Sequence, residues 1–190
     1  MLHLASQSPR RRQLLEQIGV PFAVLDVEVA EQRAARESPH EYVSRVARDK
    51  ARAGWASLGH AGDAVVLGAD TEVVLGHSIF GKPRDAKDAA AMLERLSGRT
   101  HDVMTAVAVR WEDRTDVEVS VSRVTLRKLT RAEIDRYVAS GEPLDKAGGY
   151  AIQGLAAAFI TRLEGSYSGV MGLPLAETAT LLGRAGVAIL

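Results

Sequence analysis

Apolar residues along this 190-residue chain fall into short β-rich runs separated by amphipathic segments with helical spacing. The strongest runs are residues 65–67 and 73–75, which a short polar segment containing Asp70 separates. Continuous apolar runs of this kind favour strands buried on both faces of a sheet. A buried carboxylate is costly unless it has a partner or a task. Asp70 is therefore either a functional group at the end of a strand or the cap of a turn between two strands.

Further strands are predicted at residues 2–5, 22–25, 79–80, 159–163 and 187–190, and a long hairpin at 101–111 and 116–126. Helices are predicted at residues 9–18, 39–58, 85–96, 131–141 and 174–182, and loops at 141–150 and 165–173. Two of the helices begin with the capping-box pattern, at Ser38 with Glu41 and at Thr130 with Glu133. Strands and helices mix irregularly, which predicts an α/β protein with a mixed sheet. Length and the lack of a linker predict one domain over residues 1–190.

Composition narrows the function classes. The net charge of zero disfavours broad binding of nucleic acid or of a membrane surface. The chain has no cysteine, which excludes disulfides and thiolate sites. Its start lacks an apolar leader segment, and no apolar run approaches the roughly 20 residues that span a bilayer. A cytoplasmic protein without nucleic-acid or membrane partners is expected.

The first predicted helix begins unusually. Ser8 and Pro9 suit its N-cap and first position, but its first turn carries Arg10, Arg11 and Arg12, where acidic residues are favoured. Backbone N–H groups, guanidinium groups and the hydroxyls of Ser6 and Ser8 would converge there on an anion, for which phosphate is the natural choice. The alternative is a solvated basic face.

Other charged residues extend this picture. Lys50 lies on a basic helical face, and Lys82 stands at the end of a strand before Pro83. Residues 76–82 match half of a P-loop, but Pro83 replaces the Ser or Thr that binds Mg²⁺, so a P-loop is rejected. The five histidines lack metal-ligand spacing and no G-x-S-x-G elbow occurs, which disfavours a zinc hydrolase and a serine triad. Cations with the carboxylates of Asp70 and Glu31 are the parts of a phosphate-transfer site, to which Lys146 and Asp145 are weaker candidates.

Several motifs occur in the order typical of the Maf family, which this chain resembles over nearly its whole length. They are Ser6-x-Ser8-Pro9-Arg10-Arg11, Leu67-Gly68-Ala69-Asp70-Thr71, Gly81-Lys82-Pro83, Leu96-Ser97-Gly98-Arg99-Thr100-His101, Glu142-Pro143-Leu144-Asp145-Lys146-Ala147-Gly148, Ile152-Gln153-Gly154 and Gly165-Ser166-Tyr167 through Leu175. The resemblance implies an elongated mixed sheet with packed helices and a cleft between two lobes, as in inosine triphosphate pyrophosphatases. It implies a nucleoside triphosphate pyrophosphatase that uses Mg²⁺, with Mn²⁺ as an alternative.

The resemblance also assigns roles to residues. Asp70 takes the position of the proton acceptor. Combined with the residue-based reasoning above, this adds Lys50 and Lys82 as catalytic groups that hold the triphosphate and Ser6, Ser8 and Arg11 as substrate-binding residues. Arg10, Thr71 and Gln153 fall on positions that separate substrate subgroups, and they are similar to the dTTP/UTP subgroup, whereas the 7-methyl-GTP subgroup has Trp, Gln and Glu there. Asp70 and Glu31 would hold the metal ion. The segment Val29-Ala30-Glu31 departs from the common V-D-E, which weakens the assignment of Glu31.

Other functions remain open on the sequence. The chain could be a non-catalytic, nucleotide-sensing regulator of septum formation, but the intact Ala69-Asp70-Thr71 favours an enzyme. A pyrophosphatase for another base, such as CTP or 7-methyl-GTP, is a second alternative. A nucleic-acid-binding protein is disfavoured by the low aromatic content of 5%. A homodimer is left open.

Overall fold

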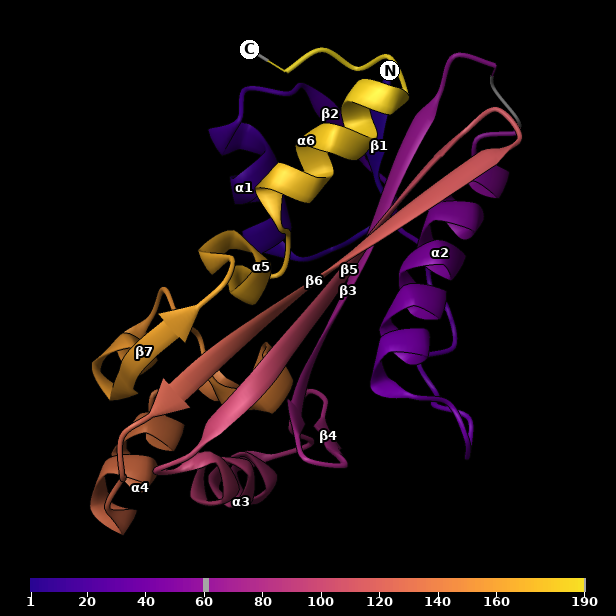
Figure 1. The fold of residues 1–190 in the computed structure, drawn as a ribbon. Helices are drawn as coiled ribbons and strands as arrows, with labels where there is room; N and C mark the ends of the chain where they lie inside the picture. The colour runs from indigo at the N-terminus through magenta and orange to yellow at the C-terminus, as the bar shows by residue number, and fades with distance from the viewer. Residues whose placement is uncertain (60–61, 190) are drawn as a thin grey trace. The chain divides into compact units, whose positions relative to one another are not determined.

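The computed structural model describes residues 1–59 and 62–189, which form a seven-stranded mixed sheet with helices packed on it (Figure 1). The strand order is β2-β1-β3-β5-β6-β7, and β4 pairs with β3. The strands are β1 (Leu2–Leu4), β2 (Phe22–Val24), β3 (Val65–Leu75), β4 (Ser78–Phe80), β5 (Thr100–Trp111), β6 (Arg114–Leu126) and β7 (Ile160–Glu164). The α-helices are α1 (Pro9–Gln17), α2 (Pro39–Ser57), α3 (Ala86–Leu96), α4 (Arg131–Ala139), α5 (Tyr167–Met171) and α6 (Leu175–Arg184). Three 3₁₀ helices are η1 (Glu142–Asp145), η2 (Ala147–Gly149) and η3 (Leu155–Phe159).

The chain divides into two compact units, each built from segments that are distant in sequence. The first unit contains Met1–Asp70, Thr105–Ser120 and Gly172–Leu190. In it β1 lies between β2 and β3 and is parallel to both, so that Leu4 is level with Val24 on one side and with Leu67 on the other. Helix α2 lies on one side of these strands, and α1 and α6 lie on the other (Figure 1). Apolar residues of α2 pack on β3 around Trp55 and Val66.

The second unit contains Thr71–Met104 and Val121–Met171. Its core is one apolar cluster, to which α3 contributes Leu93 and Leu96 and α4 contributes Ile134 and Tyr137. Strand β4 runs antiparallel to the end of β3, and β7 runs antiparallel to β6 with a register shift after Thr125. Helices α3 and α4 lie side by side and cover this cluster.

Most predicted elements are confirmed, including the mixed sheet and both capping boxes. Three predictions are wrong. Residues 65–67 and 73–75 belong to one continuous strand, residues 165–173 contain the short helix α5, and residues 187–189 form no strand. Leu190, which the last predicted strand included, lies outside the described residues. The loop at 141–150 contains the turns of η1 and η2.

Candidate active site

Asp70 lies in the middle of β3, not at a strand end or in a turn, and it is 7% exposed. Its Oδ1 accepts a hydrogen bond from Lys50 Nζ at 2.9 Å. The strand can continue through this carboxylate because Lys50 compensates its charge, so the polar segment does not have to turn out to solvent. Its Oδ2 is buried and has no hydrogen-bond partner within the described ranges. A buried carboxylate with one oxygen left open is available to a ligand or to a proton.

Gly68 explains how Lys50 reaches Asp70. A Cβ at Gly68 would lie 2.4 Å from the carbonyl oxygen of Ala47 and 2.6 Å from the backbone nitrogen of Ala51, both on α2. The missing side chain therefore lets α2 approach the backbone of β3. Gly68 and Asp70 are two residues apart, so they share one face of the strand, and this face receives the helix that carries Lys50. Gly68 thus makes room for the backbone of a helix.

Lys50 contacts a second carboxylate, that of Glu31. Its Nζ lies 2.7 Å from Glu31 Oε1, and the side chains of Lys50, Glu31 and Asp70 are 12%, 44% and 9% exposed. The structure therefore brings together three of the residues that the sequence analysis assigned to catalysis or metal binding. Exposure falls from Glu31 to Asp70, which places Glu31 at the solvent side of this triad of charges.

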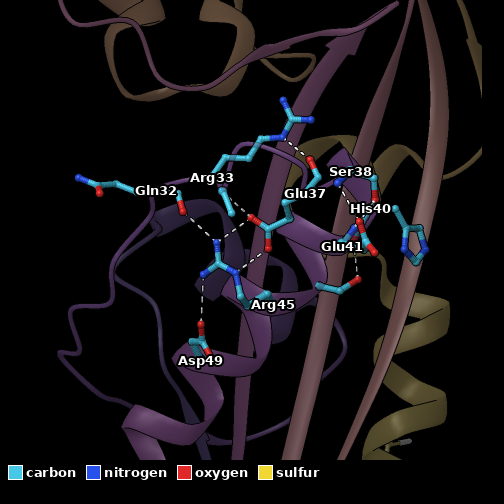
Figure 2. Close-up of polar contacts among 10 residues, drawn as sticks. Gln32, Arg33, Glu37, Ser38, His40, Glu41, Arg45 and Asp49 are labelled. Carbon is cyan, nitrogen blue, oxygen red and sulfur yellow. Dashed lines mark hydrogen bonds and ion pairs between the residues drawn. The ribbon is translucent and has the colours of Figure 1, made fainter.

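Arg45 holds the irregular segment that carries Glu31 (Figure 2). Its guanidinium donates from Nε to Glu37 Oε1 at 2.6 Å and from Nη2 to Glu37 Oε2 at 3.0 Å. The same Nη2 donates to the backbone carbonyl of Gln32 at 2.9 Å, directly after Glu31. Hydrogen bonding to Arg45 lowers the pKa of Glu37, so this pair stays ionised at neutral pH. Because α2 carries both Arg45 and Lys50, one helix fixes the segment and contacts its carboxylate.

The sequence analysis missed Arg45 because a basic helical face gives no indication of which cation has a partner. The capping box at Ser38 was the available signal, since it fixes the start of α2 directly after Glu37. Helical spacing predicts contacts only between residues three or four positions apart. It therefore cannot predict a bidentate pair between an arginine and a carboxylate eight residues earlier.

The basic start of α1 is only partly an open anion site. Arg11 is buried, donates from Nε to the carbonyl of Gly172 at 2.8 Å and donates from Nη1 to Ser6 Oγ at 3.1 Å. Burial lowers the pKa of the Arg11 guanidinium, and the charges of Asp70 and Glu31 oppose that shift. Arg11 is therefore within electrostatic reach of both carboxylates of the triad.

Two expectations for this helix start need correction. The hydroxyl of Ser8 caps no backbone N–H, although Ser8 is the N-cap residue. Arg12 does not join a cluster of three guanidinium groups, because its Nη2 donates to the backbone carbonyl and to the side chain of Gln7. Arg10 is half-buried at the first turn and adds to the positive charge around Arg11.

The second unit carries the three remaining candidates. Thr71 follows Asp70 on β3, Lys82 is exposed after β4, and Gln153 is exposed in the turn before η3. The backbone N–H of Gly148 donates to the carbonyl of Gly81 at 3.1 Å, which ties the loop at 141–150 to the turn that carries Lys82. Of the weaker candidates, Lys146 donates to Asp145 and to the carbonyl of Glu142, so it supports this loop.

The donor set at Asp70 and Glu31 fits a magnesium ion. Mg²⁺ is commonly bound by one or two carboxylates and completes its shell with water and substrate phosphates. The two carboxylates here contact the same ammonium group, and one oxygen of Asp70 has no hydrogen-bond partner among residues 1–59 and 62–189. Among the described residues no cluster of three or more His, Cys, Asp or Glu could hold a metal. His60 lies outside those residues.

The mixed α/β sheet thus carries a triad of Asp70, Lys50 and Glu31 that runs from a buried to an exposed carboxylate, with the buried Arg11 within electrostatic reach. Cations fixed beside carboxylates are the parts of a site that binds and cleaves phosphate compounds. The chain belongs to the Maf family, since the family model of Maf-like proteins matches residues 1–185. A dTTP/UTP pyrophosphatase of Xanthomonas oryzae is 56% identical over 188 residues, covering 98% of this chain and 99% of the relative.

Two other relatives and one solved structure extend the comparison. A dTTP/UTP pyrophosphatase of Saccharophagus degradans is 57% identical, covering 95% of this chain and 87% of the relative. A nucleoside triphosphate pyrophosphatase of Xylella fastidiosa is 55% identical, covering 96% of this chain and 97% of the relative. A nucleoside-triphosphatase, or dITP/XTP pyrophosphatase, of Mycobacterium abscessus is 17% identical with a TM-score of 0.41, covering 67% of this chain and 74% of that chain.

No helix in the described part of the chain is long and apolar enough to cross a membrane.

Proposed function

We propose that this protein hydrolyses nucleoside triphosphates to the monophosphate and pyrophosphate, with dTTP and UTP as substrates. The observation that carries the proposal is the buried carboxylate of Asp70, which Lys50 holds through one oxygen while the other oxygen has no partner among the described residues. Relatives that match nearly the whole chain are named dTTP/UTP pyrophosphatase, which supports both the proposed reaction and the proposed bases.

Cationic and hydroxyl groups would bind the triphosphate. Arg11, which Ser6 and Gly172 fix in place, and its neighbour Arg10 offer positive charge at the start of α1. Lys82 and the Ser8 hydroxyl complete the set that we assign to the phosphates. Fixed cations of this kind stabilise charge that develops on phosphate oxygens in the transition state.

Asp70 would accept the proton of the attacking water. The water oxygen forms a bond to the α-phosphorus, the bond from that phosphorus to the bridging oxygen breaks, and pyrophosphate leaves with the bonding electrons. The proton passes to Asp70 Oδ2, the oxygen that Lys50 does not occupy. Lys50 keeps the carboxylate in one orientation, and a general base held in this way contributes about 10²–10⁴ in rate.

Asp70 and Glu31 are the residues that would hold Mg²⁺, or Mn²⁺ in its place. When bound, the ion neutralises charge on the phosphate oxygens. Lys50 contacts both carboxylates, so it keeps them close together and limits their mutual repulsion.

Arg10, Thr71 and Gln153 are the residues that we propose for the choice of base. Uracil and thymine present an acceptor at O4 and a donor at N3, and a Gln amide can match both. An amide can also turn over to match cytosine, whereas an arginine has donors only. Discrimination against cytosine would therefore rest on Arg10 together with Gln153.

Product analysis in ¹⁸O water tests the reaction. With UTP or dTTP, we expect intact pyrophosphate and one solvent oxygen in the monophosphate. Release of orthophosphate and a diphosphate would contradict the proposal. Tight binding of the nucleotide without turnover, in the presence of Mg²⁺ or Mn²⁺, would instead favour the nucleotide-sensing regulator.

The kcat/KM ratio of UTP to CTP tests the choice of base. Arg10→Ala and Gln153→Ala should each lower this ratio, because each leaves a polar edge of the base without its partner. A mismatch of this kind costs about 1–3 kcal/mol, or roughly 10- to 100-fold. If Arg10→Ala weakens UTP and CTP equally, Arg10 binds phosphate alone.

A further inference from the structure

Gln153 lies in a short turn, and hydrogen bonds hold the backbone on both sides of that turn. The backbone N–H of Gly154 donates to the carbonyl of Ala151 at 3.1 Å, which closes a turn with Gln153 near its tip. Gln153 is exposed, while Ala151 and Ile152 before it and Ala156 after it are buried. The side chain is therefore presented to solvent from a fixed base.

Two polar side chains, the buried Tyr137 and the half-buried Glu142, hold this turn at both ends. The hydroxyl of Tyr137 accepts a hydrogen bond from the N–H of Ala151 at 3.3 Å and donates to Glu142 Oε1 at 2.8 Å. Glu142 Oε2 in turn accepts from the N–H of Leu155 at 3.0 Å, and Oε1 accepts from Ala156 at 3.4 Å. Tyr137 is 3% exposed, so its hydroxyl has no ready replacement from solvent.

Gly154 shows how tightly the turn closes on Glu142. A Cβ at this position would lie 2.4 Å from Glu142 Oε1 and 2.5 Å from Oε2. The carboxylate thus occupies the space where the side chain of residue 154 would be. Burial, followed by the hydrogen bond to Glu142, raises the pKa of the Tyr137 hydroxyl, so it stays protonated and continues to donate to Glu142.

We infer that Tyr137 and Glu142 are positioning residues that set the selectivity for uracil and thymine through the turn that carries Gln153. This inference rests on the proposed role of Gln153 in reading the base. The Gln153 amide can turn over, so its contribution to selectivity depends on where its backbone holds it against the base edge, and a turn that shifts loses that register. Neither residue has to touch the substrate for this effect.

The test compares Tyr137→Phe and Glu142→Gln with wild type. Phe keeps the ring and removes the hydroxyl, and Gln keeps the shape while replacing one accepting oxygen by a donor. We expect each variant to lower the kcat/KM ratio of UTP to CTP by about tenfold. This is the effect of losing one hydrogen bond between the Gln153 amide and the base. Amide hydrogen exchange at residues 151–156 should become faster in both variants. Glu133→Gln is the matched control, since Glu133 is also a capping carboxylate of this unit but bonds to Thr130 and Arg127.

Three outcomes distinguish this inference from the proposed function. Faster amide hydrogen exchange at residues 151–156 together with a lower kcat/KM ratio of UTP to CTP in Tyr137→Phe and Glu142→Gln supports the positioning role. An unchanged ratio in Tyr137→Phe and Glu142→Gln, while Gln153→Ala lowers it, overturns the positioning role and leaves base reading by Gln153 intact. An unchanged ratio in Gln153→Ala overturns both.

Gly154→Ala gives a second test that does not depend on catalysis. The loss of thermal stability caused by Gly154→Ala should be smaller in a Glu142→Ala background, because the added Cβ then has room. Equal losses in the two backgrounds would show that Glu142 does not constrain the turn, and would overturn the inference.

Discussion

Gly68 and Lys50 meet so closely that a Cβ on Gly68 would lie 3.1 Å from the Cβ of Lys50. The distance between strand and helix at this point therefore decides whether the ammonium group reaches Asp70. A packing requirement in the core and a requirement of the candidate active site fall on the same glycine.

Gly68→Ala should consequently reduce both stability and activity. The new methyl group would meet the backbone of α2, and overpacking of this kind costs about 1–3 kcal/mol. We expect a lower midpoint of urea unfolding and a fall in kcat that persists at temperatures where the variant is folded. Gly183→Ala is the control, because its Cβ would meet nothing within 4 Å. A Gly68→Ala variant with full activity would refute the link between this approach and Lys50.

Asp70→Asn should abolish most turnover and leave the fold in place. Asn has nearly the same shape but cannot take the proton of a water molecule, and the loss of a general base lowers the rate by about 10²–10⁴. Glu31 still pairs with Lys50, so the ammonium group keeps a partner. The measurements are kcat for UTP and the thermal unfolding curve. Asp88→Asn, at a surface pair with Arg84, controls for the loss of one carboxylate. Retention of more than about a tenth of kcat would remove Asp70 from the chemistry.

Arg45→Gln should loosen the segment that carries Glu31. Its loss removes the bidentate pair with Glu37 and the bond to the carbonyl of Gln32. We expect faster proteolysis within residues 26–37 and a several-fold higher Mg²⁺ concentration for half-maximal activity, with kcat recovered at saturating Mg²⁺. Arg48→Gln on the same helix is the control. Unchanged proteolysis would show that the segment is held by other contacts.

His101 predicts a specific pH dependence of stability. It is 3% exposed, and burial lowers its pKa to about 4 from the ordinary value of 6.5. The unfolded chain binds a proton at His101 below about pH 6.5 while the folded protein does not, so the free energy of unfolding falls as pH drops from about 6.5 to about 4. The contribution is about 2–3 kcal/mol.

Urea unfolding at pH 7.0, 5.5 and 4.5 measures this effect. His101→Gln should show a flatter dependence on pH than wild type, although it loses stability at pH 7 because Tyr150 loses its 2.7 Å partner. His77→Gln, at an exposed turn, should follow wild type. Parallel curves for wild type and His101→Gln would contradict the assignment.

The sequence predicted helices and turns well where the residues that determine them are close together in the chain. Both capping boxes and the long hairpin predicted at residues 101–111 and 116–126 are confirmed. It failed at β3, because a polar interruption in an apolar run is typical of a turn unless a partner elsewhere in the chain compensates the charge. That partner, Lys50, lies 20 residues earlier on another element.

The candidate site likewise contains residues that the sequence could identify and supporting residues that it could not. The sequence analysis singled out Asp70, Lys50 and Glu31, which the structure brings together. It gave no indication of Arg45, Tyr137 or Glu142 as supports, because their contacts depend on how loops fold back. Arg12 was misjudged for the same reason, since only the path of residues 5–8 places Gln7 beside it.

The bond from Arg11 to Gly172 links residues 161 positions apart and closes the first unit with the last segment of the chain. A ribosome therefore delivers the start of α1 long before the carbonyl that orders its buried guanidinium. Until residue 172 has been synthesised, the guanidinium of Arg11 lacks this acceptor. A chain truncated after Met171 should therefore lack this bond and hold the Arg11 side chain less firmly than the longer chain.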